Sequence, residues 1–300
     1  MIGPGSVGTA LAIRCRRAGL SLRTLVGRTP EASRRAAERV GAGEACSLDE
    51  WATSVSESGA DPPEPIWLLL TVRDDAISRV AETVATTLGR IGVRLDGSIA
   101  VHASGALAHD VLEPLRSVGA RLASVHPLRS FADPERAAED FQGTWCFHDE
   151  DSEITASIVS WIEAIGGRAA SLASDAKPLY HAAASLASNG TVALLQAAAR
   201  MLEAAGIERP AATEALVALV AGTLDNAAAV GVPAALTGPA DRGDGDSLVR
   251  HRTAIDTRLP DVAELYTNVQ LAAVDAALAK GSIDASTAAE LRSRLRGAGS

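Results

Sequence analysis

The sequence is poor in cysteine, in lysine and in long apolar runs. Its three cysteines, Cys15, Cys46 and Cys146, stand far apart and outside any CxxC or Cys/His spacing. Neither a disulfide framework nor a metal site is therefore expected, and each cysteine is predicted to be a small buried apolar residue. The longest apolar runs, such as residues 66–72, are too short to span a bilayer, and no charged and apolar leader precedes the first glycines. These absences predict a cytoplasmic location and no membrane partner.

An excess of positive charge is also missing. The formal net charge is -9 and the pI is about 5.2, which argues against nucleic acid or an anionic membrane as the main partner. Apolar residues make up 47% of the 300 residues, so the chain can bury most of its surface in one large or two ordinary domains. A globular protein that acts on a small molecule is the expectation.

A glycine pattern, G-x-G-x-x-G, stands at the start of the chain. Gly3 permits a tight turn, Gly5 lets the backbone approach a pyrophosphate, and Gly8 brings a helix against a strand. The helix amino terminus favours the negative charge of the phosphates. A strand at 21–26 and a helix at 30–40 follow, which is the order of a βαβ unit. The predicted cofactor-binding residues of this turn are Gly3, Pro4, Gly5, Ser6, Val7 and Gly8.

The strand that should precede this turn is almost missing, since only Met1 and Ile2 stand before Gly3. In a dinucleotide fold that strand lies in the middle of the sheet. Its loss would leave backbone groups of both neighbouring strands unpaired in the interior. The expectation is that the natural chain begins several residues earlier, or that this version binds nucleotide poorly.

The residues after the second strand bear on which nucleotide is bound. Where an NAD-preferring site carries Asp or Glu, this chain has Gly27, Arg28 and Thr29. An arginine and a hydroxyl suit a 2′-phosphate, so NADP is predicted as the cofactor and NAD is less favoured. The alternative is that Arg28 is one of many surface arginines.

Polar residues follow three further predicted strands, at 66–71, 98–101 and 121–125. Ligands of open α/β sheets lie beyond the carboxyl ends of the strands. Thr71, Val72 and His102 are therefore expected to contact the cofactor, and Ser104 and His126 to lie near the nicotinamide or the substrate. The alternative is that both histidines are structural.

The remaining pattern changes from mixed to helical. Strands at 44–46, 144–147 and 168–172, with helices from residue 48, after residue 72 and at 152–165, complete a Rossmann-like, mostly parallel α/β domain over residues 1–173. Helices at 175–206, 210–230, 244–257, 260–280 and 284–296 form an all-α domain over residues 174–300. Their small side chains allow close packing in a bundle or in a dimer.

One helix of the second domain carries a line of polar residues. Lys177, His181, Ser185 and Asn189 follow one another at i+4 spacing and share one ridge. Burying them without partners would cost free energy, which favours a ridge that faces a wet cavity. A solvated helix face is the alternative.

Together these motifs resemble one family, the proteins that join a Rossmann-like domain to domain of unknown function 2520. The resemblance rests on the glycine turn, His102–Ala106, His126–Phe131, Lys177 with Tyr180, His181 and Asn189, Leu236–Pro239 with Arg242–Asp244, and His251. It implies an NADP oxidoreductase with a layout similar to pyrroline-5-carboxylate reductase, ketopantoate reductase and the β-hydroxyacid dehydrogenases. It also implies a helical domain that forms a homodimer, and a lysine and an asparagine that act on the substrate, matched here by Lys177 and Asn189. His181 stands where ketopantoate reductases tend to carry Asn.

Two functions stay open at this stage. The first is an NADP-dependent oxidoreductase that transfers a hydride to a small keto acid or imine. Lys177, one of two lysines, is then the proton donor, because an amine passes a proton where a guanidinium does not. His181 is a relay, Asn189 or Ser104 orients the substrate, and His126 lies beside it. The second function is a non-catalytic NADP(H)-binding sensor or scaffold dimer, which has no use for the polar ridge.

Overall fold

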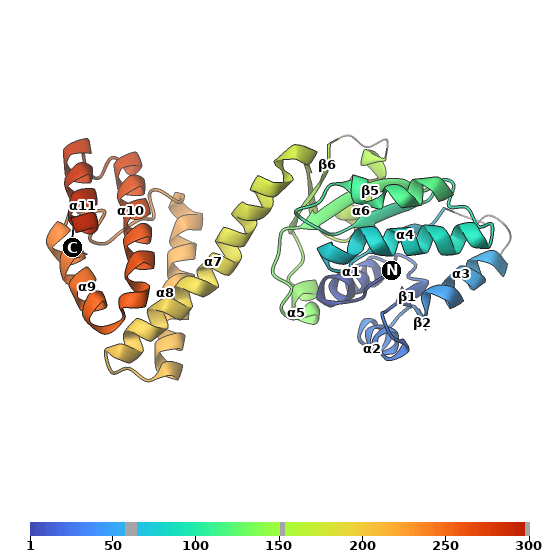
Figure 1. The fold of residues 1–300 in the computed structure, drawn as a ribbon, viewed down its shortest axis with the longest axis horizontal. Helices are drawn as coiled ribbons and strands as arrows, with labels where there is room; N and C mark the ends of the chain where they lie inside the picture. The colour runs from blue at the N-terminus through green and yellow to red at the C-terminus, as the bar shows by residue number, and fades with distance from the viewer. Residues whose placement is uncertain (58–64, 151–153, 298–300) are drawn as a thin grey trace. The chain divides into compact units, whose positions relative to one another are not determined.

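The computed structural model describes residues 1–57, 65–150 and 154–297 (Figure 1). The chain divides into two compact units, Met1–Ser188 and Asn189–Ser300. The division falls inside the long helix α7 (Lys177–Ala204), whereas the sequence predicted a boundary just before this helix. Each unit is described by itself.

The first unit is a sheet with helices on both faces (Figure 1). Its strands are β1 (Thr24–Val26), β2 (Glu44–Cys46), β3 (Trp67–Leu70), β4 (Ile99–His102), β5 (Arg121–Pro127), β6 (Trp145–Asp149) and β7 (Arg168–Leu172). Its helices are α1 (Ser6–Arg17), α2 (Pro30–Val40), α3 (Leu48–Glu57), α4 (Asp74–Arg90), α5 (Pro134–Glu139) and α6 (Thr155–Ala164), with 3-10 turns η1 (His109–Val118) and η2 (Ser174–Ala176). The predicted α/β class is confirmed.

Local sequence accounts for most of these elements, with small shifts at their ends. Pro30 stands at the first turn of α2, where its missing N–H is not needed, and Gly41 ends the helix in the left-handed conformation. The short helices η1 and α5 lie in segments for which the sequence predicted no element. The start of the helix predicted at 152–165 lies outside the described residues.

Parallel pairing dominates the sheet. β1 pairs with β2, and β3, β4 and β5 pair in sequence order, all parallel. β6 runs antiparallel to β5, and β7 runs parallel to β6. The strands β3 and β4 are apolar on both sides because helices cover both faces of the sheet.

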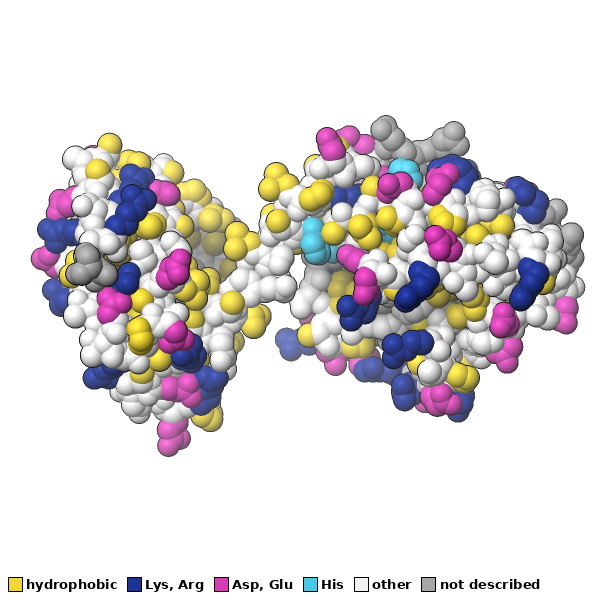
Figure 2. Space-filling view, viewed as in Figure 1, with side chains coloured by type: hydrophobic (Ala, Val, Ile, Leu, Met, Phe, Trp, Pro, Cys, Tyr) yellow, Lys and Arg dark blue, Asp and Glu magenta, His cyan; other side chains and the backbone are white. Residues whose placement is uncertain are grey.

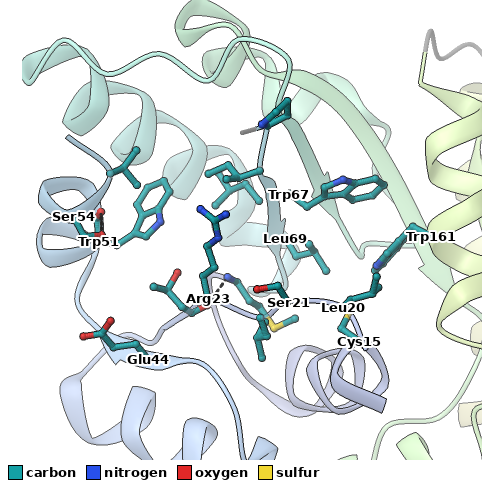
Figure 3. Close-up of a pocket in the computed structure, with 17 residues that line it drawn as sticks. Cys15, Leu20, Ser21, Arg23, Glu44, Trp51, Ser54, Trp67, Leu69 and Trp161 are labelled. Atoms are coloured by element: carbon teal, nitrogen blue, oxygen red, sulfur yellow. Dashed lines mark hydrogen bonds between the residues drawn. The ribbon is translucent and has the colours of Figure 1, made fainter. Parts of the chain in front are cut away.

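Met1 and Ile2 occupy the central position between β1 and β3. Ile2 forms parallel bridges to Val26 and to Leu70, and the Met1 nitrogen donates to the carbonyl of Thr24 at 2.8 Å. These two residues therefore join the two parts of the sheet, in the place predicted for the first strand. Behind Met1, at the amino ends of the strands, lies a cavity of about 540 Å³ (Figure 3).

The second unit is helical, as predicted. It contains the end of α7, followed by α8 (Arg209–Val230), α9 (Gly245–Arg258), η3 (Pro260–Val262), α10 (Ala263–Lys280) and α11 (Ala285–Gly297). Leu248, Val274, Leu291 and Leu295 form the centre of its core. Across the described parts of the chain, one helix, α8, is long and apolar enough to cross a membrane, although none of its most apolar stretch is buried within the chain. By length and composition, α8 therefore departs from the expectation that the apolar stretches of the chain are too short to span a bilayer.

Candidate active site

The glycine turn lies directly against the end of β3. Gly3 has a φ of 80°, and a Cβ at this position would collide with the side chain of Val72. A Cβ on Gly8 would collide with the hydroxyl of Thr71, which donates a hydrogen bond to the Gly3 carbonyl at 2.8 Å. Thr71 and Val72, predicted as cofactor contacts, thus hold the turn in shape.

The amino terminus of α1 is available to an anion. Gly5 is its N-cap and provides no side-chain cap, and the first turn carries no acidic residue. The nearest described atom to a Cβ on Gly5 would be the Gly3 carbonyl oxygen, at 4.0 Å, so the backbone is open to close approach. Backbone N–H groups and the helix dipole at such an end favour phosphate. These residues fit a dinucleotide pyrophosphate.

Arg28 and Thr29 have different environments after β1. The Thr29 hydroxyl accepts a hydrogen bond from the Ala32 N–H at 3.2 Å and caps α2. The side chain of Arg28 is exposed. Of this pair, Arg28 is the residue whose side chain a ligand can reach from solvent.

His102 and Ser104 organise the loop after β4. The His102 ring is buried, its Nδ1 accepts from the Ser104 N–H at 3.1 Å, and its Nε2 lies 2.9 Å from the Ala108 carbonyl oxygen. Burial lowers the pKa of His102 to about 4, so the ring is neutral with its proton on Nε2. The Ser104 hydroxyl donates to Asp74 at 2.8 Å and accepts from two backbone N–H groups of the loop. His102 therefore has the structural role that was its alternative in the sequence analysis, and Ser104 has a structural role as well.

His126 belongs to a different group, at the end of β5. Its Nδ1 lies 2.6 Å from the Tyr180 hydroxyl oxygen. The ring of His181 approaches that of His126 edge-on, with 6.0 Å between centroids, and Phe147 packs on Tyr180 at 4.7 Å. A Cβ on Gly105 would lie 2.8 Å from His181 Nδ1 and 3.0 Å from the His126 ring. The loop after β4, the strands β5 and β6 and the start of α7 thus meet at one cluster.

Electrostatics keep the two central members of this cluster neutral. Burial, and then the positive charges of His181 and Lys177, lower the pKa of His126 to about 4. Burial raises the pKa of Tyr180 above its usual value. At neutral pH the pair is a phenol bonded to a neutral imidazole, an arrangement that can hold or pass a proton.

Lys177 lies in a closed polar network. It is 1% exposed, its Nζ donates to the Ser124 hydroxyl at 2.5 Å, and its Nζ lies 3.3 Å from Asp149 Oδ1. Asp149 Oδ2 accepts from the Ser124 N–H at 2.9 Å and lies 3.1 Å from His109 Nδ1. The prediction that this end of the ridge faces a wet cavity is wrong, because the buried ammonium has a buried carboxylate as its counter-ion.

The other predicted catalytic residues of α7 are placed differently. His181 is exposed and contacts His126, whereas Asn189 is exposed, three turns beyond Lys177, and belongs to the second unit. The structure therefore brings together His126 and His181 but does not place Asn189 with them.

The sequence predicts no role for Tyr180, Ser124 or Asp149, although Tyr180 is among the residues that carry the family resemblance. Tyr180 stands one residue before a predicted catalytic histidine, which is a signal that could have drawn attention to it. Ser124 and Asp149 lie within strands and carry no motif.

Metal ligands do not cluster in the parts of the chain that the structure describes: no group of three or more His, Cys, Asp or Glu side chains could hold an ion there. The three cysteines are free and buried, as predicted.

Two sequence models of known domains match parts of the chain. Residues 1–127 match the sequence model of a Rossmann-like domain, and residues 144–273 match that of DUF2520, a domain of unknown function. A search of curated proteins finds no significant match.

Several solved structures share this architecture. One is a protein of Bacteroides fragilis provisionally assigned as an NADP oxidoreductase, with 21% identity, a TM-score of 0.70 and coverage of 91% of this chain and 96% of that one. A Thermotoga maritima protein with no named activity has 26% identity, a TM-score of 0.68 and coverage of 93% and 98%. A reductive aminase of Aspergillus terreus, in complex with NADPH and ethyl levulinate, has 19% identity, a TM-score of 0.55 and coverage of 98% and 90%.

Proposed function

We propose that this chain, in which a Rossmann-like domain is followed by a DUF2520 region, is an NADP(H)-dependent oxidoreductase that reduces a small keto acid or imine. The observation that carries the proposal is the hydrogen-bonded pair of His126 and Tyr180, 2.6 Å apart, at the same end of the sheet as the glycine turn. The provisional assignment of the Bacteroides protein, and the NADPH bound to the Aspergillus aminase, support the choice of cofactor.

The cofactor would be held by the first βαβ unit. The N–H groups at the start of α1 bind the pyrophosphate, and Gly5 allows it to come close. The guanidinium of Arg28 binds the 2′-phosphate. When bound, NADPH supplies a hydride to the carbon of the C=O or C=N bond.

Tyr180 is the proton donor in this proposal. Reduction of C=O places negative charge on oxygen, and reduction of C=N requires a proton on nitrogen, so a donor within hydrogen-bond reach lowers the barrier. With its proton on Nδ1, His126 donates to the phenol oxygen and leaves the phenolic proton free for the substrate. Because burial raises the pKa of Tyr180, the phenol keeps its proton until a stronger base develops beside it.

The exposed His181 completes the path to solvent. Its ring lies edge-on to that of His126, with 6.0 Å between centroids, and its exposed side chain can exchange protons with water. We assign it the role of restoring the proton of the pair after each turnover.

Lys177 stabilises the neutral pair of His126 and Tyr180. Its ammonium is bound to Ser124 and Asp149, and its positive charge helps to keep the neighbouring His126 neutral. This replaces the expectation that Lys177 donates the proton itself, since donation would break a buried ion pair.

The experiment combines NADPH binding with a substrate screen. Fluorescence titration should give saturable binding, and 2-keto acids, β-keto acids and cyclic imines should be screened for NADPH oxidation. With the substrate found, Tyr180→Phe should lower kcat/KM about 10²- to 10⁴-fold because the donor is lost. The dissociation constant of NADPH should change less than about twofold, because the phenol is not among the proposed cofactor contacts.

The chain offers a matched control, because it has only two tyrosines. Tyr266 also pairs with a histidine, its hydroxyl lying 2.9 Å from His251 Nδ1, but within the second unit. Tyr266→Phe should keep full activity. Full activity of Tyr180→Phe would remove the proposed role, and saturable NADPH binding with no oxidation by any compound would favour a sensor or scaffold.

We also propose that the protein is a cytoplasmic homodimer formed through its helical unit. Large apolar side chains of α7 and α8 are exposed, including Val192 at 66%, Leu219 at 65% and Leu224 at 62% (Figure 2). A helix that is apolar on all sides needs to be buried, and the small residues of α8 allow a second helix to approach closely. Glu214 and Asp225 within α8 make a membrane the less favourable cover.

A further inference from the structure

Asp74, at the start of α4, is a charged residue that the proposed proton path does not use. Its side chain is exposed, and its Oδ2 accepts a hydrogen bond from the Ser104 hydroxyl at 2.8 Å. The next residue, Asp75, is the one that forms an ion pair with Arg73, at 3.2 Å. In the described parts of the chain, no Lys, Arg or His is paired with Asp74. Its negative charge, which the amino terminus of a helix favours, is therefore not compensated by a cation.

The position of Asp74 connects the proposed cofactor site with the loop after β4. Val72, two residues earlier, lies directly against Gly3 of the glycine turn. Ser104, which donates to Asp74, belongs to the loop that follows β4. Because β3 and β4 are parallel neighbours, both chain segments lie at the carboxyl edge of the sheet, where ligands of this fold bind.

The same loop contacts the proton-donor group. A Cβ on Gly105, the residue after Ser104, would lie 3.0 Å from the ring of His126. Burial is the main cause that lowers the pKa of His126, and the carboxylate of Asp74 acts in the opposite direction by raising it. The charge of Asp74 therefore acts on the ring that binds the hydroxyl of Tyr180.

The other charged groups that act on His126 do not cancel this negative charge. Lys177 is paired with Asp149, and both side chains are buried. His181 is an exposed imidazole, a group that is mostly uncharged in mildly alkaline solution. Among the groups that the structure describes at this place, the uncompensated charge is then that of Asp74.

We propose that Asp74 selects a cationic substrate, so that the enzyme reduces an imine as its iminium ion in preference to a keto acid. This inference rests on the proposed oxidoreductase function. The carboxylate contacts the positively charged nitrogen and stabilises it. Beside a C=O bond it would instead repel the negative charge that reduction places on oxygen, and it would also repel the carboxylate of a keto acid.

In this reaction the imine nitrogen takes the phenolic proton of Tyr180 and becomes an iminium, whose charge the carboxylate of Asp74 stabilises. The hydride that NADPH supplies forms the new C–H bond, and the electrons of the C=N π bond become the lone pair of an amine. The phenol regains its proton from solvent through His126 and His181. The amine product takes a proton from water and leaves as a cation.

The test compares Asp74→Asn with Asp75→Asn. Asparagine keeps an oxygen that accepts from Ser104, so the first change removes the charge alone. Asp75 is the matched control, because it stands in the same helix turn and Arg73 already compensates it. The probes are pyrrolidine, which is a cation at about pH 8, and tetrahydrofuran, which has oxygen in place of the charged nitrogen. Ligand NMR titrations with and without NADPH give both dissociation constants, since neither probe oxidises NADPH.

Pyrrolidine should bind the unmodified chain more tightly than tetrahydrofuran does. Asp74→Asn should weaken pyrrolidine binding about tenfold or more, because a hydrogen bond to a charged group is lost, and should change tetrahydrofuran binding less than about twofold. Asp75→Asn should change neither dissociation constant by more than about twofold. With a cyclic imine as substrate, Asp74→Asn should lower kcat/KM about tenfold or more, and the dissociation constant of NADPH should stay within about twofold.

Equal affinities for the two probes, or an unchanged affinity of Asp74→Asn for pyrrolidine, would overturn the inference. So would a keto acid that oxidises NADPH equally fast with Asp74→Asn. A loss of NADPH affinity as large as the loss of pyrrolidine affinity would also overturn it, because Asp74 would then be a cofactor contact. The proposed function fails by a different result, the absence of NADPH oxidation by any compound, and the binding of the two probes still decides the charge preference of the site.

Discussion

His102 and His126 stand at equivalent strand ends, yet their surroundings give them different roles. Both rings are neutral in the folded protein because burial lowers both pKa values to about 4. His102 uses both nitrogens on its own loop, whereas His126 uses Nδ1 on a phenol from another helix. The chemistry of an imidazole at such a site is decided by its hydrogen-bond partners.

The neutral state of His102 predicts a pH dependence of stability. Its folded pKa of about 4 lies below the usual 6.5, so the unfolded chain takes up the proton first as the pH falls. Its contribution to the free energy of unfolding is complete above about pH 6.5 and is lost as the pH falls towards 4, by about 3 kcal/mol. Urea unfolding measured across this range should show a smaller pH dependence for His102→Asn than for the unmodified protein. An unchanged dependence would contradict the assignment.

Arg28 predicts the choice between the two nicotinamide cofactors. Its exposed guanidinium is the proposed partner of the 2′-phosphate, so Arg28→Ala should weaken NADPH binding by about tenfold or more and leave NADH binding nearly unchanged. Fluorescence titration with both cofactors measures the ratio of the dissociation constants of NADPH and NADH. Arg34→Ala, which removes an exposed arginine paired with Glu31, is the control. An equal loss of affinity for both cofactors would show that Arg28 does not bind the 2′-phosphate.

At the scale of elements, the ion pair of Lys177 and Asp149 joins the start of α7 to the end of β6. Both side chains are 1% exposed, and Ser124 of β5 bonds to each of them. This charge pair therefore links three elements that lie far apart in the sequence. It fixes the start of α7 and with it the position of Tyr180, which lies one turn further along this helix.

Asp149→Asn should lower the free energy of unfolding by about 3 kcal/mol, because it leaves a buried ammonium without its counter-ion. Replacing Lys177 by Met in the same chain should restore part of the loss, since the unpaired charge is removed. Chemical denaturation of the unmodified chain and of these two variants measures the differences. The exposed pair of Asp246 and Arg294 offers the control: Asp246→Asn should change stability by less than about 1 kcal/mol. A similarly small effect of Asp149→Asn would show that the buried pair is not needed.

At the scale of the whole molecule, the exposed apolar surface of α8 predicts a dimer. Light scattering should give about twice the chain mass of 30.8 kDa. Val217 and Leu224, seven residues apart on one face of α8, are 51% and 62% exposed, and replacing both by Glu should yield a monomer. Leu265→Glu, at a 40% exposed leucine of α10, should leave the dimer intact. The proposal would be contradicted if the unmodified chain had the mass of a monomer in light scattering, or if it bound to lipid vesicles and was recovered with them.

The sequence by itself determined the class of the fold and the place of most elements. Alternation of apolar runs with Gly and Pro marks β3, α2 and the glycine turn, because these signals act within a few residues of the chain. The family resemblance was also visible, since its motifs are short and contiguous.

Only the tertiary structure decided which polar side chains do what. Lys177, His181 and Asn189 share a spacing on α7, but burial of the first and exposure of the others depend on the strands packed beside them. The pairing of Tyr180 with His126 joins residues 54 positions apart. Asp149 contacts Lys177 because β6 runs antiparallel to β5, and no local sequence pattern predicts this strand direction. Partners at such separations are set by how the elements pack, and helical spacing along one segment carries no information about them.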